Sequence, residues 1–147
     1  MRKQEIEQLL QAVDGSGSDE EWLSLRELKN LGECVAQYLP AQILTKQSAK
    51  ARALLVNLAV AYARENTHAY QVGLQALQDT DAKVQFYACK LLAYAQQPEA
   101  LFQLKTARDH SHGATLGHIQ AAMDALLQHN PHYFIDHHHT GCIFLRV

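Results

Sequence analysis

The sequence predicts an all-α protein, a short right-handed α-solenoid built from antiparallel helical hairpins. Three observations support this fold class. Alanine and leucine each occur 21 times among the 147 residues, whereas only three prolines and seven glycines interrupt them, and this composition favours helices over strands. Apolar residues recur with the spacing of one helical face along most of the chain. The helical segments follow one another through short connections, which places consecutive helices antiparallel and side by side.

The N-terminal part, residues 2–47, is expected to hold two helices and a helical continuation. Apolar residues form one stripe across residues 2–13, which indicates a first short helix. Ser18 and Glu21 have the spacing of a capping box and predict the start of a second helix. The helical pattern then continues until Pro40, which either stops it or opens the next segment.

The central part, residues 48–129, has the more regular pattern. Five helices are expected there, over residues 48–64, 67–77, 79–96, 98–108 and 113–129. Their expected N-terminal residues are Ser48, Thr67, Asp79 or Thr80, Pro98 and Gly113. The hairpins also resemble one another, because residues 49–52 align with residues 82–85 at an offset of 33. A period of this size with two helices per unit is typical of a solenoid.

The segment from Ala76 to Leu92 resembles a HEAT repeat of the short bacterial kind, which also occurs in phycobilisome-lyase-type proteins. In such repeats a turn aspartate, here Asp79, precedes a valine, here Val84, and a basic residue that opens the second helix. Gln85 replaces that basic residue in this chain. The resemblance covers residues 48–129 and implies a scaffold whose second helices form a concave, partner-binding side. It implies little about activity, because such repeats serve many partners.

The C-terminal residues 130–147 differ from the repeats. Two short runs, 133–135 and 142–145, are rich in β-prone residues and flank the polar segment 136–141. They predict a small C-terminal β-hairpin that covers the open end of the solenoid. Residues 1–147 are therefore expected to form a single domain with N-terminal helices, repeats and a C-terminal cap.

Histidines are the only residues in the chain that suggest chemistry. Eight of the nine lie between His110 and His139, and imidazole is the commonest metal ligand. However, the chain has no His-Glu-x-x-His, no Cys-x-x-Cys and no Gly-x-Ser-x-Gly motif. Asp109, His110 and Ser111 are the residue types of a triad, but a triad assembles from distant positions. We expect no catalytic residues, no metal site and no cofactor.

Charge and aromatic residues indicate a binding surface. Residues 41–64 carry four basic and no acidic residues, whereas residues 1–33 carry eight acids and four bases. Four tyrosines and one phenylalanine lie between residues 62 and 94, and tyrosine is favoured at binding hot spots. The predicted partner contacts, on or near the second helices of the repeats, are Arg52, Arg64, Lys83, Tyr87, Lys90 and His118.

These observations favour a non-enzymatic protein-binding module with one protein partner. The leading hypothesis is a bacterial immunity protein that neutralises a secreted toxin by direct binding, since the chain resembles such proteins in size and character. The alternatives are an adaptor or assembly factor, a metal-dependent enzyme using the histidine-rich part, and a nucleic-acid-binding solenoid. Without a secretory signal, a membrane span or paired cysteines, the chain is expected to be cytoplasmic and reduced.

Overall fold

The computed structural model describes residues 2–147 and consists of helices joined by short loops, with no strand in that range. Met1, which the expected domain bounds include, lies outside the described residues. The α-helices are α1 (Arg2–Gln11), α2 (Asp19–Leu31), α3 (Leu39–Thr45), α4 (Ala49–Val60), α5 (Thr67–Ala76), α6 (Ala82–Ala95), α7 (Ala100–Arg108) and α8 (Gly113–Leu127). Two 3-10 helices, η1 (Gly32–Tyr38) and η2 (Pro131–Phe134), complete the structure.

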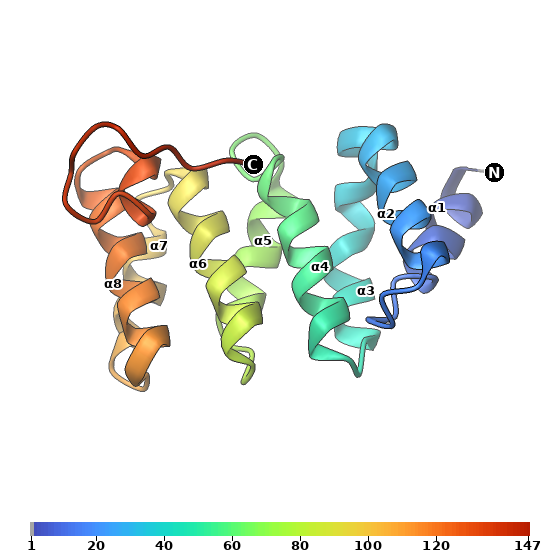
Figure 1. Cartoon of the computed structure of the whole chain (residues 1–147), viewed down its shortest axis with the longest axis horizontal. Helices are drawn as coiled ribbons and strands as arrows, with labels where there is room; N and C mark the ends of the chain where they lie inside the picture. Colours follow the sequence, from blue (N-terminus) through green and yellow to red (C-terminus); the bar gives the residue numbers. More distant parts are fainter. Residues whose placement is uncertain (1) are drawn as a thin grey trace.

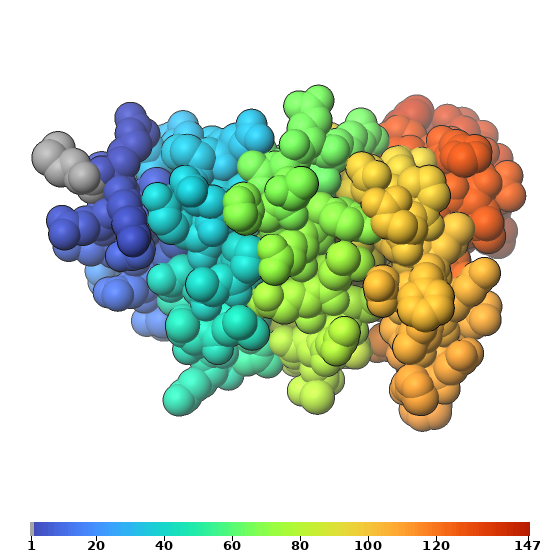
Figure 2. Space-filling view, turned by 180° about the vertical axis from the view of Figure 1, so that it is seen from behind, coloured from blue at the N-terminus to red at the C-terminus, as the bar shows by residue number. Residues whose placement is uncertain are grey.

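The helices lie in two layers that follow the chain order from one end of the molecule to the other (Figure 1). In one layer α4 packs against α6, and α6 packs against α8. In the other layer α3 packs against α5, and α7 lies behind α8. Figure 2 shows this second layer from behind, with α3, α5 and α7 side by side. The prediction of an all-α fold is confirmed.

A continuous cluster of buried apolar side chains joins the two layers from α1 to η2. Its centre is α6, where Leu91 and Leu92 are fully buried against α4 and α5. Gly73 permits the close approach of α5, because a Cβ atom at this position would collide with the Leu91 side chain. The helices therefore pack as one unit around α6.

Side-chain caps fix where α2, α4, α5 and α6 begin. Ser18 Oγ accepts a hydrogen bond from Glu21 N, and Ser48 Oγ accepts one from Ala51 N, as predicted. The caps of the next two helices are corrections. Asn66 rather than Thr67 caps α5, and Asp81 rather than Asp79 or Thr80 caps α6.

The N-terminal loop is held more firmly than its glycines suggest. Glu21 is buried, and its carboxylate accepts hydrogen bonds from the backbone of Asp14, Gly15 and Gly17. Residues 14–17 therefore form a loop wrapped around one carboxylate, and Glu21 satisfies donors outside its own helix. Beyond α2 the chain forms the 3-10 helix η1, and Pro40 then opens α3 in its first turn.

The predicted C-terminal β-hairpin is wrong. Asn130 caps the 3-10 helix η2, and the buried Asp136 then accepts hydrogen bonds from Thr140 and Gly141. Farther on, Leu145 N donates to His132 Nδ1 at 2.9 Å. Side chains rather than a second strand therefore satisfy the backbone donors of this segment, so no ladder forms.

Candidate functional site

The outward face of α6 carries three of the predicted contact residues. Lys83, Tyr87 and Lys90 stand four and three residues apart, so they project from the same side of the helix. Lys83 is exposed, whereas Tyr87 and Lys90 are half-buried. We call these residues, together with Asn57, Arg64 and Tyr94, the α4–α6 surface.

Lys90 connects the two helices of this surface. Its Nζ donates a hydrogen bond to Asn57 Oδ1 on α4 at 3.3 Å and lies 5.9 Å from the centroid of the Tyr87 ring. Burial lowers the pKa of Lys90 below its usual value. The ammonium group is therefore partly desolvated and held in place, which strengthens its attraction to a carboxylate that approaches from solvent.

A second cation lies at the far end of the same surface. Arg64 follows α4, and its guanidinium group stacks over the Tyr94 ring at 4.0 Å from the centroid. Its Nε also donates to the Tyr94 carbonyl oxygen at 2.8 Å. Arg64 remains exposed, so this arrangement fixes the position of its guanidinium group and leaves that group accessible to solvent.

His118 lies beside the surface, on α8. Its ring meets the Phe86 ring edge-on at 4.8 Å and lies 6.5 Å from the Phe134 ring. Burial, and then the nearby His137, lower the pKa of His118. The imidazole therefore packs α8 against α6 and is only partly available to a partner.

Arg52, by contrast, does not join this surface. Its guanidinium group donates to both oxygens of Asp79 and to the carbonyl oxygens of Lys46 and Gln47. Its side chain is only 20% exposed. Arg52 therefore connects the loop at Lys46 and Gln47 with the loop at Asp79. Its N–H groups, which we predicted to contact a partner protein, already donate to acceptors within the chain.

Two members of the surface, Asn57 and Tyr94, were not predicted. The repeat pattern contained the signal, because Asn57 aligns with Lys90 at the offset of 33. Tyr94 follows Tyr87 by seven residues on α6 and therefore lies on the same helical face. Extending the repeat alignment to the whole exposed face would have found both residues.

The histidine-rich region is arranged around structural contacts. The His139 ring stacks on Tyr133 at 3.8 Å, and its Nε2 lies 2.5 Å from Asp124 Oδ2. His137 Nε2 lies 2.9 Å from the Phe134 carbonyl oxygen. Within residues 2–147, no three histidine, cysteine or acidic side chains converge as metal ligands would. None of the helices in that range has the length and apolar character that a membrane crossing requires.

No family model, curated protein or solved structure matches this chain. The resemblance to HEAT repeats therefore rests on the residue pattern of 48–129 alone. The candidate site is therefore defined by its own geometry, as a basic and aromatic face across α4 and α6.

Proposed function

We propose that this chain is a non-enzymatic protein-binding module that binds one protein partner through the α4–α6 surface. The partner is a secreted toxin domain, and the chain acts as a bacterial immunity protein that neutralises it in the cytoplasm. The proposal includes the solenoid architecture, in which α4, α6 and α8 are the second helices of successive HEAT-like repeats. The single observation that carries it is the pairing of two fixed cations, Lys90 and Arg64, with two tyrosine rings of α6.

Charge complementarity supports an acidic partner. Lys83, Lys90 and Arg64 all project from this surface, and Lys90 and Arg64 are held by contacts within the chain. Ordering these side chains in advance lowers the entropy lost on binding. A toxin with an acidic inhibitor-binding face would therefore associate rapidly and in a salt-dependent manner.

The two tyrosines supply the apolar part of the surface. Tyr87 and Tyr94 are half-buried, and each ring has a cation within 6 Å of its centroid, namely Lys90 Nζ at 5.9 Å and Arg64 Cζ at 4.0 Å. Binding energy at protein interfaces concentrates in tryptophan, tyrosine and arginine side chains. Tyr87 lies at the centre of the set and is the expected anchor.

The test begins with affinity capture of the tagged protein from its native cell and mass spectrometry of stoichiometric partners. The affinity of the captured polypeptide is then measured by calorimetry for the wild type and for Tyr87→Ala and Lys90→Ala. We expect each variant to weaken binding at least tenfold, on the order of 2 kcal/mol for the tyrosine anchor. Lys105→Ala, an exposed change on α7 in the other layer, is the matched control and should bind as the wild type does.

Two results would contradict the proposal. If Tyr87→Ala melts the fold in circular dichroism, Tyr87 is a core residue and not a contact. If both α4–α6 variants bind normally while remaining folded, the partner binds elsewhere. Recovery of a subunit of an enzyme complex in place of a toxin would favour the adaptor function, and an empty capture would oppose both.

A further inference from the structure

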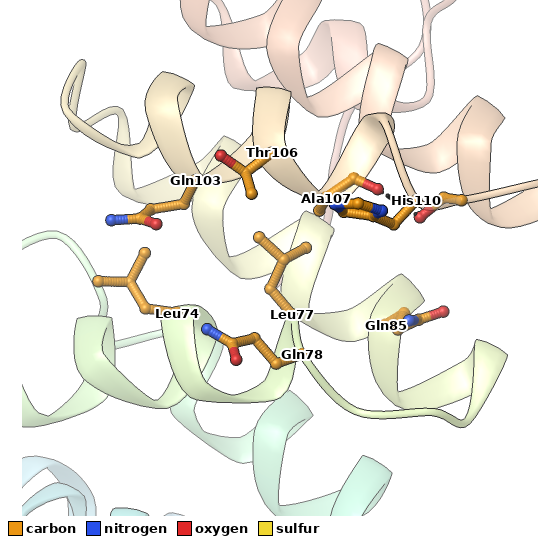
Figure 3. Close-up of a pocket in the computed structure, with 9 residues that line it drawn as sticks. Leu74, Leu77, Gln78, Gln85, Gln103, Thr106, Ala107 and His110 are labelled. Atoms are coloured by element: carbon orange, nitrogen blue, oxygen red, sulfur yellow. Dashed lines mark hydrogen bonds between the residues drawn. The ribbon is translucent and has the colours of Figure 1, made fainter.

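A cavity of about 310 Å³ lies between α5 and α7, and Gln85 of α6 also lines it. Figure 3 shows Leu74, Leu77 and Gln78 projecting into it from the α5 side, and Gln103 and Thr106 facing them from α7. Its volume is at the lower end of the range for ligand sites in proteins.

The cavity lies where α5 and α7 do not pack directly against each other, whereas α3 and α5 do. On the other side of α5, the Gln75 amide donates to the Pro40 carbonyl oxygen at 3.1 Å, and α3 packs directly against α5. Across the cavity, by contrast, the α7 residues Gln103 and Thr106 are exposed and form no hydrogen bond to α5.

Several hydrogen-bonding groups converge on this space without partners of their own. The side-chain amides of Gln78, Gln85 and Gln103 have no hydrogen-bond partner in the part of the chain that the structure describes. Each amide offers both a donor and an acceptor. Thr106 also lines the cavity, and its hydroxyl already donates to the Phe102 carbonyl oxygen at 3.1 Å.

The lining also limits what the cavity can bind. No charged residue lines it, so nothing there compensates the desolvation of an ionic ligand. Its only ring is the His110 imidazole, whereas sites for bases use aromatic stacking. The lining therefore fits a neutral ligand that has alternating hydrogen-bond donors and acceptors and an apolar part. An extended polypeptide has these properties.

We propose that the α5–α7 cavity binds an extended, uncharged peptide segment of a partner protein. The amides of Gln78, Gln85 and Gln103 pair with the N–H and C=O groups of the peptide main chain. Leu74 and Leu77 provide the apolar floor that accepts one aliphatic side chain of the segment. The cavity lining shares no residue with the α4–α6 surface, so the site does not depend on the proposed function.

The experiment selects peptides from a random twelve-residue phage library against the intact protein and measures their affinities by fluorescence anisotropy. We expect enriched peptides with an uncharged centre that contains an aliphatic residue. Thr106→Phe, which places a ring in the cavity from an exposed position, should weaken their binding at least tenfold. Gln103→Ala should also weaken it, whereas Lys29→Ala, at an exposed position on α2, should leave the affinity within twofold of the wild type.

The proposal is overturned if no peptide is enriched, if charged motifs dominate, or if the folded Thr106→Phe variant binds normally. If Thr106→Phe does not fold, the Gln103→Ala measurement decides. Nuclear magnetic resonance titration with N-acetylglucosamine and with uridine completes the test, because saturable shifts of the His110 signals by either compound would assign the cavity to a small molecule. A toxin complex that is lost with Tyr87→Ala but kept with Thr106→Phe separates this site from the proposed function.

Discussion

The guanidinium group of Arg52 connects three segments of the chain. Nε and one terminal nitrogen donate to the two oxygens of Asp79 at 2.7 and 3.2 Å, which is the bidentate geometry of a strong charged pair. The other nitrogen donates to Lys46 O and Gln47 O, both at 3.0 Å. The hydrogen bond to Asp79 raises the pKa of Arg52, so the guanidinium group stays charged.

Replacing Arg52 with alanine should lower the free energy of unfolding by about 2 kcal/mol, because it leaves a largely buried carboxylate and two carbonyl groups without donors. Urea unfolding followed by circular dichroism measures this change. Arg52→Lys should lower the free energy of unfolding less than Arg52→Ala does, but it should not match the wild type, because an ammonium group cannot form the bidentate pair of a guanidinium group. Lys50→Ala, exposed on the same helix, is the control and should stay within about 0.5 kcal/mol of the wild type. An equal effect of both alanine variants would contradict the structural role of Arg52.

The half-buried imidazole of His118 packs α8 against α6 and η2. The His118 ring packs against Phe86 and Phe134, and burial, followed by the nearby His137, lowers its pKa. The ordinary value is 6.5, so below that pH the unfolded chain takes up a proton that folded His118 resists. Unfolding is favoured as the pH falls through this range, and the stability present above pH 6.5 is lost.

The expected result is a melting temperature that falls more steeply between pH 7 and pH 5 in the wild type than in His118→Gln, which cannot titrate. Thermal melts followed by circular dichroism at several pH values measure the two slopes, and taking their difference cancels the contribution of the other groups. His138→Gln, at an exposed position, is the matched control and should keep the wild-type slope. Identical slopes for the wild type and His118→Gln would show that the packing of α8 does not depend on this imidazole.

The elements also show what local sequence can and cannot determine. Ser18 and Ser48 are isolated small polar residues before apolar stripes, so their caps could be predicted. Asp79, Thr80 and Asp81 are adjacent, and each can cap a helix. Asp81 takes that role because Arg52, 27 residues away, binds Asp79. The C-terminal strands were expected from β-prone residues, but the buried carboxylate of Asp136 organises that segment locally.

At the scale of the whole molecule, the candidate site could be predicted only where it follows helical spacing. Lys83, Tyr87 and Lys90 were found because they share one face of a helix that the pattern identified. The contact of Arg52 with Asp79 was not predicted, because it joins distant segments and sequence spacing carries no information about it. The α5–α7 cavity depends on the distance between two helices, which a single sequence does not encode in any local pattern.

The continuous core predicts that the helices unfold together, and the cysteines provide the means to test it. Cys89 is fully buried on α6, and burial raises the pKa of its thiol to about 12, so it should not react in the folded protein. Cys34 and Cys142 are exposed and should react at once. In the variant Cys34→Ser/Cys142→Ser, labelling of Cys89 by a thiol reagent therefore reports only the opening of α6.

We expect the urea concentration at which Cys89 becomes reactive to coincide with the midpoint of helix loss measured by circular dichroism. This expectation follows from α6, which packs against α4, α5, α8 and η2 and so loses its cover only when both halves of the chain open. An array of independent repeats would behave differently, since its end helices would melt first and the circular dichroism signal would fall while Cys89 stayed protected. Separate midpoints would thus show that the two-layer structure is a chain of weakly coupled hairpins, and coincident midpoints that it is one cooperative unit.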